Sequence, residues 1–168
     1  MKKILFIVTL YTLSYNATFC QSFSDFDEVG QFVFGILKKM DTMSENEFVS
    51  VFSNNCHTIN ELSSHNLTEE DYRKQYKLLK SSSRTKKIIW KNIYYIRFQQ
   101  YQITCKNLSK GVSEFLGHLD IYANDKLEQV RVSILVHKEG GFIPKYKYYP
   151  FEIRLSSIYT SHLLDKTN

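Results

Sequence analysis

The fold is decided by the stretch Gly111–Leu155, which reads GVSEFLGHLDIYANDKLEQVRVSILVHKEGGFIPKYKYYPFEIRL. In its middle, every second position is apolar: Val130, Val132, Ile134 and Val136. The residues between them are mostly polar. A period of two residues is typical of a β-strand. The break Lys138–Gly141 and the run that follows it then predict a tight turn and a returning strand.

The same alternation extends toward the amino terminus. Residues 115–122 repeat it, and Asn124-Asp125 is a turn signal that separates this predicted strand from Val130–Val136. Residues 93–105 form a longer alternating run, rich in aromatic and β-branched side chains, which favours a strand. Because this run is long, we expect a bend or bulge within it.

The carboxyl-terminal part predicts a fourth strand over 142–149. It contains Pro144, which has no N–H to donate, so we expect an edge position or an irregularity. Residues 151–155 are expected to add a short ending strand, and 156–168 to form a loose tail.

Three helices are predicted before the strands. Apolar side chains recur at helical spacing over 25–40. The capping boxes Ser44–Glu47 and Thr68–Asp71 predict the starts of helices over 45–55 and 69–80. Helices followed by antiparallel strands define an α+β fold. We therefore expect three helices packed on a curved, mainly antiparallel, four-stranded sheet.

The amino terminus has the order of a secretory signal peptide. A basic start, Met1–Lys3, is followed by an apolar run over 4–13 and a more polar segment that ends near Cys20. The run is about half of the roughly 20 residues that a bilayer-spanning helix needs, so we expect no permanent membrane span. Cleavage after Cys20 is preferred, with Ala17 as the alternative. The bulky Phe19 argues against lipid attachment at Cys20.

The composition is that of one globular domain. The chain has 168 residues, of which 43% are hydrophobic and 23% charged. We expect a signal peptide over 1–20 and a single α+β domain over 21–155, secreted or periplasmic. The net charge of +5 includes Lys2 and Lys3 of the signal peptide. The small remaining charge argues against nucleic acid as a partner.

Cleavage leaves two cysteines, Cys56 and Cys105. An exported protein with two cysteines can form one disulfide. The sequence does not place their Cα atoms within bridging distance, so a disulfide and two buried thiols both remain open. We expect Cys56 near a helix end and Cys105 near a strand end.

Several strand patterns resemble a known superfamily. Phe115–Ile121, Val130–Ile134, Gly140–Phe142 and Pro150-Phe151 are similar to the cone-shaped proteins related to nuclear transport factor two and SnoaL cyclases, and to their secreted bacterial members. The resemblance covers roughly 25–155. It implies helices against a strongly curved sheet, a pocket in the cone and dimerisation through the sheet. Catalytic members pair an Asp with a His or Tyr; this chain has no full counterpart.

His118 and Asp120 are the candidates for chemistry. They lie two residues apart on a predicted strand, so they point to the same face, beside Leu116 and Tyr122. A neutral histidine and a carboxylate on one wall could act as acid and base. The alternative, which we favour, is an exposed polar face opposite the core.

Tyr95, Arg97 and Tyr101 are expected to share a face of the first strand, and with Tyr122 they are the candidates for ligand binding. An arginine between aromatic rings could hold a carboxylate. The alternative is cross-strand packing with the guanidinium in water.

Two other clusters have ordinary explanations. A basic and aromatic mixture over 138–154 could stack on bases or sugars, but lysines on an edge strand also prevent sheet-to-sheet association, and we favour that role. His57, Glu61 and His65 fall short of a metal site, which needs three or four supported ligands. No metal or cofactor is therefore expected.

Three functions fit these observations. The first is a non-enzymatic secreted module whose pocket binds a small apolar or peptide ligand or a protein partner. The second is a small-molecule hydrolase or isomerase that uses His118 and Asp120. The third is a structural protein of the cell envelope that forms homodimers through its sheet.

Overall fold

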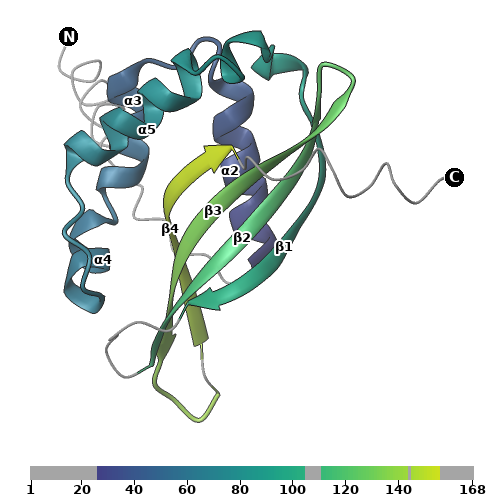
Figure 1. Cartoon of the computed structure of the whole chain (residues 1–168). Coiled ribbons are helices and arrows are strands. Elements are labelled where there is room, and N and C mark those ends of the chain that lie inside the picture. Colours follow the sequence, from purple (N-terminus) through teal and green to yellow (C-terminus); the bar gives the residue numbers. More distant parts are fainter. Residues whose placement is uncertain (1–25, 105–110, 144, 156–168) are drawn as a thin grey trace, which may run out of the picture.

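The computed structural model describes residues 26–104, 111–143 and 145–155, and its helices precede its strands. The helices pack against one four-stranded antiparallel sheet, which confirms the predicted α+β class (Figure 1). The predicted signal peptide, Cys105, Pro144 and the tail over 156–168 lie outside the described residues.

The sheet is a simple meander. Its strands β1 (Tyr94–Thr104), β2 (Val112–Ala123), β3 (Lys126–Glu139) and β4 (Lys145–Leu155) are neighbours in that order. Asn124 and Asp125, with φ of 49° and 59°, form the two-residue turn between β2 and β3. Two left-handed residues match the natural twist of a hairpin, and Asn and Asp tolerate that conformation. This hairpin sets the register of the two central strands.

The fourth strand differs from its prediction. Phe142 and Ile143 lie in the turn, and β4 is one continuous strand through Leu155 instead of two pieces. It is an edge strand, as predicted, and it contains a bulge, because Ser133 pairs with Glu152 but Ile134 pairs with Pro150.

A helix side chain completes the edge of β4 beside this bulge. The Nε2 of Gln75 donates to the carbonyl of Phe151 at 3.1 Å, and the N–H of Ile153 donates to Gln75 Oε1 at 3.0 Å. An unpaired strand edge invites association with other chains. Gln75 therefore takes the place of a fifth strand at these two groups.

The three predicted helices are present as α2 (Phe26–Lys39), α3 (Glu45–Ser53) and α5 (Glu69–Ser81). Both predicted capping boxes form: the N–H of Ser44 donates to Glu47 at 2.7 Å, and that of Thr68 donates to Asp71 at 3.0 Å. Two short 3-10 turns, Thr85–Lys87 and Trp90–Asn92, connect α5 to β1.

A further helix, α4 (Cys56–Leu62), lies where the sequence predicted a loop. Its first residue confirms that Cys56 is near a helix end. Only Ile59 of this helix is buried, so the segment has no apolar stripe for a pattern search to find. Ile59 packs with Val112, Leu135, Tyr149 and Phe151, so contacts with the sheet hold the helix.

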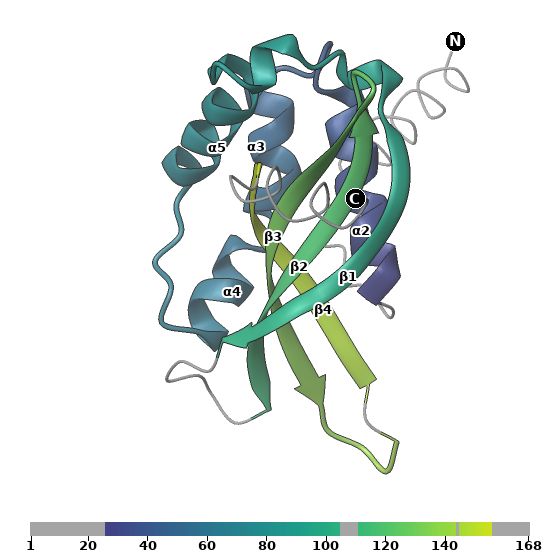
Figure 2. The same cartoon turned by 45° about the vertical axis from the view of Figure 1, so that its right-hand side comes forward.

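The core lies between α2 and one face of the sheet. This face, called the helix face below, carries alternate residues of the central strands: Leu119, Ile121, Val130, Val132 and Ile134, all fully buried. Figure 2 shows the sheet curving around α2. Phe98 fills the gap between the two layers, since a Cβ on Gly30 would lie 2.4 Å from its Cβ and a Cβ on Gly117 would lie 2.2 Å from its Cζ.

The helix does not cover the whole length of this face. Both α2 and β3 have 14 residues. A helix rises about 1.5 Å per residue and a strand about 3.4 Å, so β3 spans roughly 45 Å and α2 only about 20 Å. The hairpin of β3 and β4 therefore continues past α2 (Figure 1). Within the described part of the chain, no helix is long and apolar enough to cross a membrane.

Candidate functional site

The face of the sheet opposite the helix face, called the outer face below, contains His118 and Asp120. Asp120 is only 3% exposed. Its Oδ2 accepts from Arg97 Nε at 2.7 Å, and its Oδ1 accepts from Gln129 Nε2 at 3.0 Å. These residues come from β1, β2 and β3 and occupy one row of the sheet. A buried carboxylate is costly unless it is paired and hydrogen-bonded, and this row supplies both requirements.

His118 lies on the same face as Asp120, as predicted, and pairs in the sheet with Gln99 and Arg131. Burial lowers its pKa, and the positive charge of Arg131 lowers it further, while Asp120 opposes both effects. The neutral imidazole is therefore favoured. A neutral histidine could accept a proton from a substrate, and Asp120 would be its partner in acid–base chemistry. Both carboxylate oxygens of Asp120, however, already accept hydrogen bonds from neighbouring side chains. The row is thus organised as a cross-strand network, with Asp120 linking three strands.

The prediction that Tyr95 and Arg97 share a face is wrong. Tyr95 pairs with Ile121 and Arg97 with Asp120, so Ile96 between them is an extra residue in β1. The bulge reverses the alternation: the Tyr95 hydroxyl donates to Asp27 of α2 at 2.5 Å, whereas Arg97 reaches the outer face. The sequence predicted a bulge but not its position.

The remaining ligand candidates do not join this arrangement. Burial and the hydrogen bond to Asp27 raise the pKa of Tyr95, so its hydroxyl stays protonated. Tyr122 is an exposed residue of β2, and the side chain of Tyr101 lies outside the described residues. The structure therefore does not assemble the four predicted ligand residues into one pocket wall.

His57, His65 and Cys56 also have separate partners. His57 lies 3.9 Å from Glu61, whereas His65 turns to Glu114 on β2 at 3.2 Å. The described residues hold no group of three or more His, Cys, Asp or Glu side chains arranged for a metal ion. In this structure Cys56 is unbonded to another cysteine, and its Sγ donates to the carbonyl of Leu67 at 2.9 Å. With Cys105 undescribed, the disulfide to it stays a prediction.

A cavity of about 480 Å³ lies where the helix face continues past α2. It is lined by residues of α2, β3 and β4, the start of β2 and the residue before it: Phe26, Gly111, Ser113, Phe115, Val136, Lys138, Tyr146 and Tyr148. The pairs Ser113–Val136, Val136–Tyr148 and Lys138–Tyr146 show that its floor follows the sheet register. The cavity is therefore a direct result of the difference in length between α2 and the strands.

Aromatic rings form the end of this cavity nearest the core. The ring centroid of Phe26, in the first turn of α2, lies 6.2 Å from that of Phe115 and 5.7 Å from that of Tyr148, both edge to face. Edge-to-face packing holds these rings in fixed orientations. Lys138 is the one charged residue among the lining residues. The cavity thus combines an apolar wall with a single positive charge.

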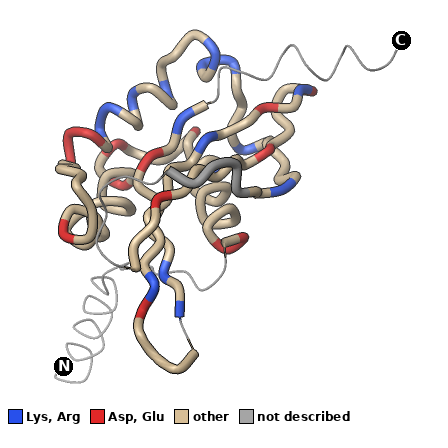
Figure 3. Tube along the Cα trace, turned by 60° about the horizontal axis from the view of Figure 1, so that its bottom comes forward, with Lys and Arg blue, Asp and Glu red and all other residues tan. Residues whose placement is uncertain are grey.

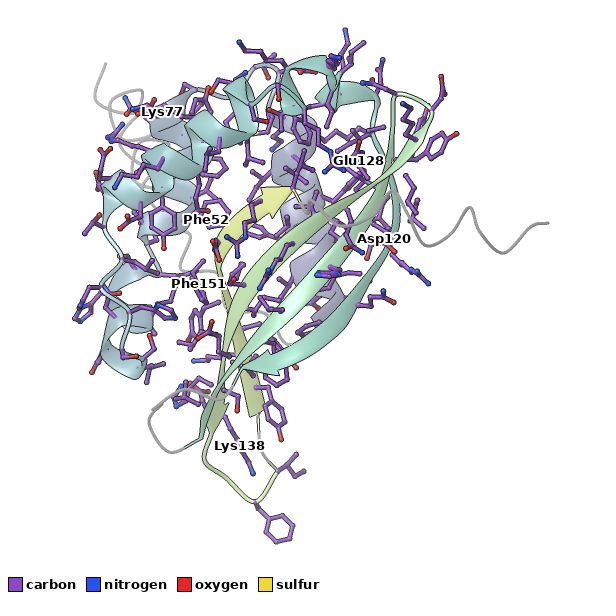
Figure 4. The ribbon with its side chains drawn as sticks, viewed as in Figure 1. Phe52, Lys77, Asp120, Glu128, Lys138 and Phe151 are labelled. Atoms are coloured by element: carbon purple, nitrogen blue, oxygen red, sulfur yellow. The ribbon has the colours of Figure 1, made fainter. Side chains whose placement is uncertain are left out.

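Figure 4 shows that this cavity and the outer-face network are distinct places: Lys138 lies next to the turn of the β3–β4 hairpin, far from Asp120. Lys138, Tyr146 and Tyr148 belong to the basic and aromatic mixture over 138–154, for which an edge-strand role was predicted. The alternation of the strands did indicate which residues share this face, because Ser113 and Phe115 lie on one face of β2, and Val136 and Lys138 lie on one face of β3. The uncovered length of this face could not be read from that alternation.

No protein-family model matches the chain, and no curated protein or solved structure matches it significantly.

Proposed function

We propose that the chain is an exported binding module whose cavity holds a small amphiphilic ligand, with an apolar body against the aromatic wall and an anionic end near Lys138. The observation that carries this proposal is the aromatic cavity itself. Ligand pockets in proteins are commonly about 300–1,000 Å³, mostly apolar, with a few polar groups that orient the ligand. The cavity of about 480 Å³ fits this description.

The charge of the cavity selects among apolar ligands. Lys138 contributes a positive charge to the lining, and no acidic side chain is among the lining residues. A carboxylate, sulfonate or phosphate end would therefore gain a charge-assisted hydrogen bond that a neutral end would not. A cationic ligand would meet the wrong charge.

The sequence and the fold are compatible with this role. The predicted signal peptide supports a location in the periplasm or outside the cell. Helices followed by a curved antiparallel sheet are compatible with the nuclear transport factor two-like superfamily, in which a pocket in the cone is common. A homodimer through the sheet also stays a prediction, which size-exclusion chromatography with light scattering would test.

Hydrolase or isomerase chemistry at His118 and Asp120 is the less favoured function. Arg97 and Gln129 already occupy the carboxylate oxygens of Asp120. A catalytic carboxylate must be able to reach a substrate proton. The arrangement of Asp120 therefore supports a structural role better than an acid–base role.

Titration calorimetry with anilinonaphthalene sulfonate, an aromatic anion, tests the proposal. We expect Ser113→Trp to abolish binding by filling the cavity, because Ser113 lies on the floor. Lys138→Gln should weaken binding about fivefold to tenfold by removing the charge pair. Lys126→Gln, at the other end of β3, is the matched control and should bind as the unaltered protein does. Equal affinity in Ser113→Trp and the unaltered protein would contradict the proposal.

A further inference from the structure

The tip of the β3–β4 hairpin exposes two large apolar residues side by side. Phe142 is 105% exposed and Ile143 is 78% exposed, relative to the extended chain. They follow Gly140 and Gly141 and lie where the hairpin projects farthest from the helices (Figure 1). Single exposed apolar residues are ordinary, but two adjacent ones at a projecting tip are a candidate contact surface.

Basic residues flank this tip on both strands. Lys138 and Tyr146 are paired across the hairpin, and Lys145 is exposed at the start of β4. Lys147 forms an ion pair with Glu139 at 2.5 Å, which neutralises one acidic group near the tip. Figure 3 shows Lys or Arg on both strands, next to a tip without charged residues. The tip is therefore apolar at its end and positively charged behind it.

We infer that this hairpin tip docks on an anionic lipid surface, with Phe142 and Ile143 entering the boundary between headgroups and acyl chains. Lys138 and Lys145 then face the lipid phosphates, and Tyr146 lies at headgroup depth, where tyrosines are enriched. Apolar side chains together with nearby positive charges give reversible attachment to anionic membranes.

A lipid surface fits the tip better than a second protein does. Stable protein interfaces bury about 800 Å² on each partner, which two side chains on a convex tip cannot supply. A lipid surface deforms around a small convex group and provides the negative charge that the lysines match. The tip also adjoins the proposed ligand cavity, because Lys138 and Tyr146 belong to both. Docking would place the cavity at the membrane, where amphiphilic molecules reside.

Co-sedimentation with vesicles tests the inference. We expect the purified protein to bind vesicles of phosphatidylglycerol and phosphatidylcholine, and to bind pure phosphatidylcholine at least tenfold more weakly. Binding to the anionic vesicles should fall as salt is raised, because the lysine contribution is electrostatic.

Variants separate the tip from the rest of the molecule. The double substitution Phe142→Ser with Ile143→Ser should reduce binding to anionic vesicles at least tenfold, and Lys145→Gln about fivefold. The matched control is Leu78→Ser on α5, which removes another apolar residue, 62% exposed, and should change nothing. Any contribution of the amino-terminal apolar run is shared by all variants, so their comparison isolates the tip.

Three outcomes would overturn the inference: equal vesicle binding by the tip variant and the unaltered protein, equal binding to neutral and anionic vesicles, or tip-dependent self-association without vesicle binding. The test is independent of the proposed function. Ser113→Trp should still bind vesicles, and the Phe142→Ser, Ile143→Ser variant should still bind anilinonaphthalene sulfonate. Loss of one property without the other identifies which proposal fails.

Discussion

At the row of Asp120, the two faces of the sheet are buried by different means. On the helix face, Leu119 and Val130 are fully buried because α2 and its neighbours pack on them. On the outer face, Asp120 and Gln129 are also buried, but they are polar and hydrogen-bond to each other. At this row, neighbouring residues of the same strands therefore depend on different forces, the hydrophobic effect on one side and a hydrogen-bonded polar network on the other. Farther along the outer face, Leu135 is buried by apolar packing with Ile59 of α4.

The largest expected loss of folding stability is for a substitution on the helix face. Leu119→Ala should lower the free energy of unfolding by about 3 kcal/mol, because it removes a fully buried side chain and leaves a cavity. Urea denaturation measures this loss. Tyr122→Ala, an exposed position of the same strand, is the control and should cost much less. Similar losses at both positions would mean that the helix face is not the core.

The second effect tests how closely α2 approaches the sheet. Gly30→Ala should be less stable than Gly35→Ala by about 2 kcal/mol, because the Gly30 Cβ would overlap Phe98, whereas nothing lies within 4 Å of a Cβ on Gly35. Both glycines are in α2, so the gain in helix propensity, about 1 kcal/mol, is the same for each and cancels. Equal stability of the two variants would place α2 farther from the sheet.

The third largest expected loss of folding stability is for a substitution on the outer face. Asp120→Ala should cost about 1–3 kcal/mol, because it removes the acceptor of the buried Gln129 amide and the ion pair with Arg97. A double-mutant cycle with Arg97→Gln should give a coupling energy of about 0.5 kcal/mol or more. Additive effects in this cycle would show that the row is not a network.

The smallest effect is the pH dependence contributed by His118. Burial and Arg131 lower its pKa below the ordinary value of 6.5, so the unfolded chain takes up the proton first as the pH falls. Folding stability from this group is therefore complete above about pH 6.5 and decreases as the pH falls below it. Urea midpoints measured at about pH 7.5 and about pH 5.5 should differ less in His118→Gln than in the unaltered protein. An unchanged difference would remove His118 as its source.

Strands and capped helices were predictable because their signals are local. A period of two residues is enough to define Val130–Val136 as a strand with two unlike faces. The capping boxes at Ser44 and Thr68 begin α3 and α5 because each needs only four consecutive residues.

The missed features depend on residues that are distant in the sequence. The helix α4 rests on contacts of Ile59 with the sheet. The bulge at Ile96 depends on the pairing of β1 with β2, and it moves Arg97 to the face opposite Tyr95. A shift of one residue reverses every side chain beyond it, so a face assignment fails when a bulge is misplaced.

The amino-acid order alone therefore determined the class of fold, the helix starts and the alternation of each strand, since propensity, capping and periodicity act over a few residues. Packing decided which side chains meet. The pairing of Arg97 with Asp120 and the aromatic cavity beyond α2 arise because strands extend farther per residue than helices and because three strands align their side chains in rows.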